Sequence, residues 1–234
     1  MPTDAATLSP PGQSLAQLRL MQLVSPALPI GGFTYSQGLE YAVEAGWVND
    51  VPSLQDWLLG QIEDTLAHLE VPVLACLYHA CVSQDIDALE EWAGYLLACR
   101  ETRELRLEEQ QRARALTRLL ADLQIGDAQR WQASLEQCQA APYALAAVSW
   151  GIRLQEAALG YTWSWLENMV AAAIKLVPLG QTDGQRVQLV LAESIPEAVR
   201  KGLALDEDEI GASAPAMALA SCLHETQYTR LFRS

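Results

Sequence analysis

Two long stretches of the sequence, residues 143–159 and 162–177, carry apolar side chains on almost every side of a helix. Such helices usually lie at the centre of a protein and are covered by other elements on most sides. Gly160 lies between them and predicts a break, and Pro178 with Gly180 predicts the end of the second helix. Elsewhere, apolar residues recur at helical spacing, and strand-like alternation never exceeds a few residues. The sequence therefore predicts an all-α fold, a single globular domain of roughly eight to ten helices.

Two segments make specific predictions about helix faces. The first helix is expected after Ser14, a candidate N-cap, with an apolar face formed by Leu15, Leu18, Met21 and Val24. Another helix is expected to run from a capping box at residues 87–90 as far as Leu123. Its i,i+4 pairs, Arg100–Glu104 and Glu108–Arg112, are typical of a solvated helix. Between these two, Pro72 either kinks a helix or occupies the first turn of a new one.

Charge and composition restrict the classes of function. The chain has 234 residues, half of them hydrophobic, and a formal net charge of −14. A nucleic-acid-binding protein needs a basic face, which this charge opposes, so no nucleic acid is expected as a partner. An acidic surface attracts basic partners or cations, although solubility alone also explains it.

The expected compartment is the cytoplasm. The five Cys residues form no CxxC pair, and residues 1–15 lack the basic start and apolar run of a targeting segment. No uninterrupted apolar run reaches transmembrane length, so no membrane association is expected. Residues 1–13 are predicted to form a flexible tail, 14–224 a helical domain, and 225–234 a C-terminal partner-binding tail.

The segment from Ser25 to Trp47 combines prolines, a Gly-Gly pair and aromatic residues directly before an expected helix. Proline holds the entry extended, and glycine permits backbone angles closed to other residues. Thr34 and Gln37 fit a capping box, which predicts a helix starting near Tyr35, and Gly46 is placed to end it. This spacing suits either a shaped binding surface or an ordinary connection between helices.

Catalytic and metal-binding patterns are missing. The sequence has no G-x-S-x-G, and its glycine-rich segment 180–184 lacks the lysine of a phosphate-binding loop. Cys76 and His79 share a helix face, but Cys81 points elsewhere, so the spacing predicts no tetrahedral site. His224, in the C-terminal segment, is expected to contact a partner or solvent. These absences argue against an enzyme and against a resident cofactor.

Two positions have both a structural and a functional interpretation. Lys175 lies near the end of an otherwise apolar helix, where its charge is either favoured by the helix C-terminus or held toward a partner. The C-terminal tail carries bulky apolar residues beside Arg230 and Arg233, a combination common in binding anchors. Such a tail either folds onto a partner or docks on its own core.

Three segments together carry a family resemblance. PALPIGGFTYSQGLEYAVEAGWV at 26–48, KLVPLGQTDGQR at 175–186 and HETQYTRLFRS at 224–234 resemble, in order and spacing, the urease accessory protein UreF family. The resemblance implies a helical homodimer that binds UreD (also called UreH), and this pair recruits the GTPase UreG. The assembly delivers nickel to apo-urease, so nickel and GTP belong to the wider complex and not to this chain.

The resemblance assigns partner-facing roles residue by residue. The first segment contributes Pro29, Gly31, Gly32, Phe33, Tyr35, Ser36, Gly38 and Glu40; the second contributes Lys175, Gln181, Gln185 and Arg186; the tail contributes Tyr228, Arg230 and Leu231. The tail is expected to dock to UreD, whereas the first two segments face either the dimer axis or UreG. Two other hypotheses stay open: a metallochaperone with its own nickel site, and an enzyme of unknown chemistry on a helical scaffold.

Overall fold

The computed structural model describes residues 11–212 and 214–234, and these residues form helices and no strand. The α-helices are α1 (Pro11–Leu23), α2 (Leu39–Glu44), α3 (Val51–Gln61), α4 (Val71–Ser83), α5 (Ile86–Ala98), α6 (Arg103–Asp122), α7 (Gln132–Leu135), α8 (Ala140–Ser149), α9 (Leu154–Leu176), α10 (Gln181–Ala192), α11 (Ile195–Gly202) and α12 (Pro215–His224). Short 3₁₀ turns are η1 (Gly32–Thr34) and η3 (Glu207–Glu209), and η2 (Ile62–Glu70) is a π-helix. The predicted all-α class is confirmed; the predicted tail 1–13 lies largely outside the described residues.

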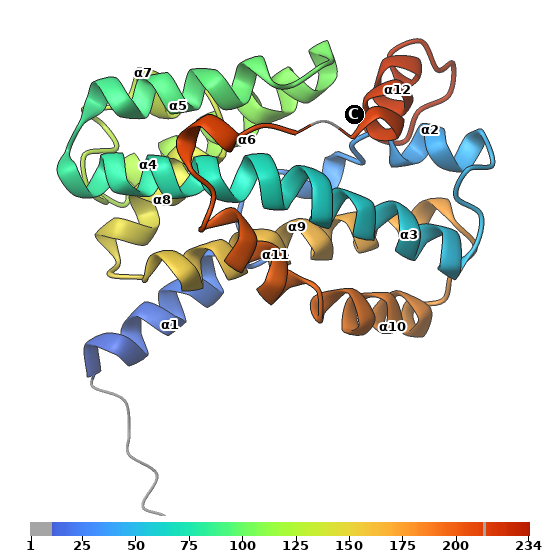
Figure 1. Cartoon of the computed structure of the whole chain (residues 1–234), viewed down its shortest axis with the longest axis horizontal. Helices are drawn as coiled ribbons and strands as arrows, with labels where there is room; N and C mark the ends of the chain where they lie inside the picture. The colour runs from blue at the N-terminus through green and yellow to red at the C-terminus, as the bar shows by residue number, and fades with distance from the viewer. Residues whose placement is uncertain (1–10, 213) are drawn as a thin grey trace, which may run out of the picture.

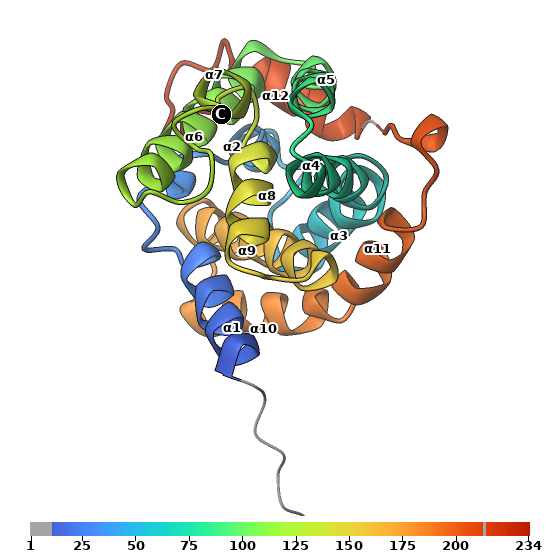
Figure 2. The same ribbon diagram turned by 90° about the vertical axis from the view of Figure 1, so that its left-hand side faces the viewer.

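The helices pack in one body around α8 (Figures 1 and 2). Every residue of α8 from Ala140 to Ala147 is buried, and α4, α6 and α9 surround it. This central position confirms that the apolar stretch beginning near Tyr143 belongs to the core. The break between the two apolar helices, however, lies at residues 150–153, so α9 begins at Leu154.

Gly160 is therefore inside α9, and the prediction that it separates two helices is wrong. A Cβ atom at Gly160 would lie 2.7 Å from a methyl carbon of Leu20 and 2.9 Å from one of Val24. The glycine is needed because α1 packs closely on α9 at this point. Glycine is found both where two helices pack closely and where one helix ends, so the sequence alone could not distinguish these two roles for Gly160.

The α1 helix buries a different face from the predicted one. It starts at Pro11, so Ser14 is not its cap, and Leu15, Leu18 and Met21 are all exposed. Ala16 and Leu23 are buried instead. The helix presents apolar residues on both sides, so periodicity alone could not choose the face that packs on α9.

The segments α3, η2 and α4 form one continuous helix, Val51–Ser83, which brings the number of α-helices among the described residues to 11. Pro72 cannot donate a backbone hydrogen bond, and it lies just after the π-helical stretch, in the first turn of α4. Of the two predicted alternatives, Pro72 occupies the first turn of α4, but α4 continues the preceding π-helical stretch and is not separated from it.

By length and composition this continuous helix could cross a membrane, with a mean hydropathy of 1.4 over an 18-residue window. The helix contains no uninterrupted apolar run of transmembrane length, because charged residues such as Glu63 and Asp64 interrupt it. However, 67% of that window is buried inside the protein, and a core helix meets the same criteria. Its composition is explained by its place against α8 and α5.

The predicted helix from residue 87 to Leu123 is two helices. It breaks between Ala98 and Arg103, with Thr102 capping α6 through its side chain. The predicted Arg100–Glu104 pair is consequently wrong, because Arg100 lies in the break and contacts other carboxylates. The Glu108–Arg112 pair is present at 2.9 Å, but it is buried and not solvated.

Gly202 and Gly60 offer a matched test of this packing. A Cβ at Gly202 would lie 2.7 Å from the backbone oxygen of Ala67 in η2, whereas nothing lies within 4 Å of one at Gly60. We expect Gly202→Ala to lower the free energy of unfolding by about 1–3 kcal/mol. Gly60→Ala should raise it by up to about 1 kcal/mol, through helix propensity alone. Urea unfolding followed by circular dichroism measures both, and equal effects would contradict the packing.

Candidate functional site

The C-terminal tail crosses the first signature segment and is bonded to it through the backbone. The amide of Arg233 donates to the carbonyl of Thr34 at 2.9 Å, and the amide of Ser36 donates to the backbone oxygen of Ser234 at 2.7 Å. The Ser36 hydroxyl donates to the same oxygen at 2.5 Å. Segments about 200 residues apart thus form one junction, and the tail docks on its own chain.

The first segment reaches this junction through an irregular backbone. Tyr35 is extended, and Gln37 and Gly38 both have positive φ, so the helix begins only at Leu39 and not near Tyr35 as predicted. At Gly38, with φ of 81°, a Cβ would lie 2.9 Å from the backbone nitrogen of Ser221 in α12. Glycine is required here by both its angle and its neighbour. Gly46, at φ of 76°, ends α2 as predicted.

Glu40 is the centre of the junction. Its carboxylate accepts the backbone amides of Leu231 at 2.6 Å and Phe232 at 2.9 Å, and it lies 3.1 Å from Nε2 of His224. The other ring nitrogen of His224 lies 2.6 Å from Glu104, whose second oxygen pairs with Arg230. Two carboxylates therefore hold the tail, and one imidazole links them.

His224 is fully buried, so the expectation that it contacts solvent or a partner is wrong. Its imidazole is enclosed because α12 packs against α2 and α6 supplies Glu104. The two carboxylates lie against opposite ring nitrogens and do not converge on one point. Sequence reasoning also missed Glu104 and Ser234; the only available signal was that His224 belongs to the tail motif.

The second signature segment touches the junction only at its first residue. The Lys175 ammonium lies 5.4 Å from the centre of the Phe232 ring, a cation–π contact from α9 to the tail. Gln181, Gln185 and Arg186 are exposed on α10, where Arg186 pairs with Asp183. These three are not brought together with the tail.

The predicted site residues divide into a buried and an exposed set. Gly32, Tyr35, Ser36, Gly38 and Glu40 are buried and shape the junction. Pro29, Phe33, Tyr228, Arg230 and Leu231 are exposed around it, and Gly31 is half-buried with a φ of 72°.

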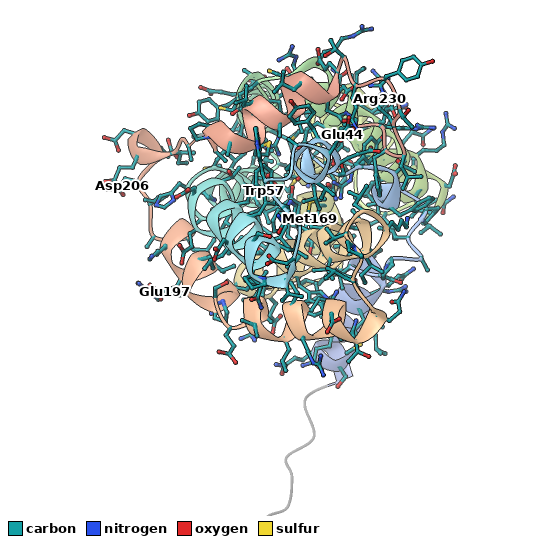
Figure 3. All side chains as sticks on the ribbon, turned by 90° about the vertical axis from the view of Figure 1, so that its right-hand side faces the viewer. Glu44, Trp57, Met169, Glu197, Asp206 and Arg230 are labelled. Atoms are coloured by element: carbon teal, nitrogen blue, oxygen red, sulfur yellow. The ribbon has the colours of Figure 1, made fainter. Side chains whose placement is uncertain are left out.

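A cavity of about 360 Å³ opens between the tail and α6. Tyr35, Gln111 and Arg233 form part of its wall, and the Tyr35 hydroxyl donates to Gln111 at 2.7 Å. Arg230 also lines this cavity, and Figure 3 labels it near the C-terminal tail. Leu107 and Phe232 also line the cavity, so its wall combines polar and apolar side chains.

A buried ionic cluster lies beneath this surface. Arg100 binds Glu70 at 2.9 Å and Glu109 at 2.5 Å, and Tyr161 donates to the second Glu70 oxygen at 3.0 Å. The backbone amide of Gln139, before α8, donates to Glu109. Glu108 accepts from Arg112, from Gln37 and from the Ser234 hydroxyl, which connects the cluster to the tail.

The two adjacent glutamates of the cluster have opposite pKa shifts. Burial raises the pKa of Glu108 above its ordinary value, and Arg112 only partly offsets this. Burial also disfavours ionised Glu109, but Arg100 and the Gln139 amide outweigh it and lower the pKa of that carboxyl. Glu109 therefore ionises more readily than an ordinary glutamate, and Glu108 ionises less readily.

The described residues contain no metal centre of the ordinary kind: no three His, Cys, Asp or Glu side chains among them could hold an ion together. Burial raises the pKa of Cys76 to about 11 and that of Cys81 to about 12. Both thiols are therefore protonated at neutral pH and are poor nucleophiles. The candidate site is suited to recognising a partner through hydrogen bonds, charge and apolar contact.

Replacing Glu40 tests its hold on the tail. Glu40→Ala removes the acceptor of two tail amides, so we expect hydrogen exchange at Leu231 and Phe232 to accelerate by about tenfold or more. Exchange in α8 should change far less. Glu193→Gln, at an exposed position, is the control; unchanged tail exchange in Glu40→Ala would contradict the assignment.

The ionic cluster predicts opposite pH dependences for two conservative variants. The lowered pKa of Glu109 stabilises the fold above its unfolded-state pKa of about 4.3, and this contribution is lost as pH falls. The raised pKa of Glu108 contributes to the stability of the fold at low pH, and this contribution is lost as pH rises. The stability difference between wild type and Glu109→Gln should therefore shrink as pH falls below about 4.3. The stability difference between wild type and Glu108→Gln should instead shrink as pH rises toward neutral. Urea unfolding at a series of acidic to neutral pH values measures both differences.

The comparisons with known proteins agree with the three-segment pattern. The UreF family model matches residues 48–192. The urease accessory protein UreF of Pseudomonas putida strain W619 is 55% identical over 220 residues, covering 94% of this chain and 98% of its own. The UreF proteins of Alcanivorax borkumensis and Klebsiella pneumoniae strain 342 are 53% and 47% identical, covering 94% and 93% of this chain and 98% and 97% of their own. This chain belongs to the UreF family of urease accessory proteins.

Proposed function

We propose that this chain acts in urease maturation as a non-catalytic scaffold in the cytoplasm. Together with UreD (UreH), it recruits and regulates the GTPase UreG, and the assembly inserts nickel into apo-urease. Membership of the UreF family supports the pathway. One observation carries the scaffold role: the buried carboxylate of Glu40 holds the backbone of the C-terminal tail, while the side chains of Tyr228 and Leu231 are exposed.

The tail is the part of this surface best suited to bind UreD. Tyr228 is 103% exposed and Leu231 is 65% exposed, although both are large and partly or wholly apolar. The backbone of the tail is bonded to Glu40 at Leu231 and to Thr34 at Arg233, so a partner would lose little free energy in ordering this part of the tail. Tyrosine is enriched among residues that dominate binding energy. Arg230 is bonded to Glu104, so its role is at least partly to position the tail.

The remaining predicted residues fit further contacts of the scaffold. Gln181, Gln185 and Arg186 lie on one exposed helix, α10, and are available to UreG or to a second copy of this chain in a homodimer. Phe33, 62% exposed beside the junction, is equally available. Nickel and GTP are assigned to the wider complex, with no cofactor bound by this chain.

The alternatives have weaker support. A metallochaperone with its own nickel site needs converging ligands, and the described residues offer no such group. An enzyme needs reactive groups in an accessible pocket, whereas Arg100, Arg112 and their glutamate partners are buried and bonded to one another. The scaffold hypothesis assigns partner binding to the exposed residues and a structural role to the buried Arg–Glu pairs.

Truncation of the exposed tail side chains tests the proposal. We expect Tyr228→Ala and Leu231→Ala to weaken capture of UreD by at least about tenfold, with little change in thermal stability, because neither side chain is buried. Pull-down with purified UreD, followed by addition of UreG, measures the loss. Val82→Ala, an exposed apolar position on α4, is the matched control. Undiminished UreD capture by both tail variants would refute the tail assignment.

A further inference from the structure

A second recess lies outside the three signature segments. It is a cavity of about 220 Å³ between the α3–η2 helix and the start of α12. Asp56, Trp57 and Asp64 come from the first side, and Pro215 and Met217 from the second. In Figure 3, Trp57 is labelled in this region, between the two helices. The proposed scaffold function uses none of these residues.

The α3–η2 wall has an acidic residue on either side of a notch. Asp56, Gly60 and Asp64 follow one another at four-residue spacing, and all three line the cavity. Gly60 supplies the notch, because a Cβ there would meet nothing within 4 Å. Both aspartates are exposed, and within the described part of the chain neither forms an ion pair.

The floor of the cavity is apolar. Met217 and Ala214 are buried, and they belong to a small cluster against which Trp57 packs. The ring of Trp57 lies 6.4 Å from that of Trp47, which supports it from behind. An aliphatic stem would gain apolar contact here, and a cation beside the indole would gain from its π-face.

Two groups at the cavity favour a hydrogen-bond acceptor. The indole nitrogen of Trp57 is buried without a partner. The α12 helix begins at this wall with Pro215, and no side chain caps it. Unmet donors at a helix start favour an acceptor oxygen, such as a peptide carbonyl.

We propose that this cavity, the acidic slot, is a docking site for an arginine or lysine side chain on an extended segment of a partner protein. The cationic head would lie between Asp56 and Asp64, its stem over Met217, and a backbone carbonyl near α12. No basic residue lines the slot, and the net charge of −14 favours approach of a basic segment. Its volume lies below the roughly 300–1,000 Å³ of pockets for drug-sized ligands, which fits one side chain better than a cofactor. The inference rests on the proposed function only in taking the occupant to be a partner protein.

The test uses the full chain and blocked tripeptides. The probe is acetyl-Leu-Arg-Leu-amide, compared with acetyl-Leu-Glu-Leu-amide and with free L-arginine. Binding is read from the NMR signal of the Trp57 indole N–H, assigned by its loss in Trp57→Phe. We expect a saturable shift with the arginine peptide only, and weaker binding at raised salt.

Two variants and one control locate the site. Gly60→Leu fills the notch while favouring the helix, and Asp56→Asn with Asp64→Asn removes the charges; each should weaken peptide binding by about tenfold or more. Glu193→Gln with Asp208→Asn removes two charges elsewhere and should leave binding within about twofold. No saturable shift, an equal shift with the glutamate peptide, tighter binding of free arginine, or unchanged binding by both slot variants would overturn the proposal.

Capture of UreD and UreG by the wild-type chain separates this inference from the proposed function. Capture without peptide binding refutes the slot alone. Peptide binding without capture of either protein refutes the scaffold assignment and leaves the slot as a site for basic peptides.

Discussion

The burial of Arg100 between Glu70 and Glu109 is the interaction on which the rest of the arrangement depends. A guanidinium removed from water must be paired, and here both carboxylates lie within 2.9 Å of it. Glu70 comes from the end of the π-helical stretch, and Glu109 from α6. The pairing therefore requires the break between α5 and α6, because a continuous helix would carry Arg100 away from Glu70.

The position of α6 in turn creates the surface that carries the tail. One helix presents Glu104 to His224 and Arg230, Glu108 to Ser234, and Gln111 to Tyr35. These contacts lie along successive turns, so the tail follows α6 and closes over the first segment. The backbone of residues 231–234 is hydrogen-bonded to Glu40 and to the first segment. The side chains of Tyr228 and Leu231 are left exposed to solvent.

Buried charge is a costly way to hold a structure together, and apolar residues of similar volume often serve stability as well or better. The buried charges here fix the direction in which the chain runs. A carboxylate that accepts two neighbouring amides fixes the path of the chain, which apolar contact with Phe232 alone would not do. We infer that Glu40, with Glu104 and Glu108 on α6, specifies where the tail lies, at some expense in stability.

Local sequence determined a good part of this protein: the all-α class, the central place of the stretch around Tyr143, the ends of helices at Gly46 and Pro178, and the three segments that carry the family pattern. These features depend on periodicity, backbone freedom and motif order, all of which are written in neighbouring residues. Tertiary structure alone decided which face of α1 is buried and that Gly160 serves close packing. It also decided that Arg100 and Glu104 pair with other residues and not with each other. It also placed His224 between two carboxylates from distant helices and assembled the acidic slot. The physical reason is that burial and pairing depend on partners from other helices, some of them more than 100 residues away. A local pattern holds no information about which of several chemically suitable partners will contact a residue.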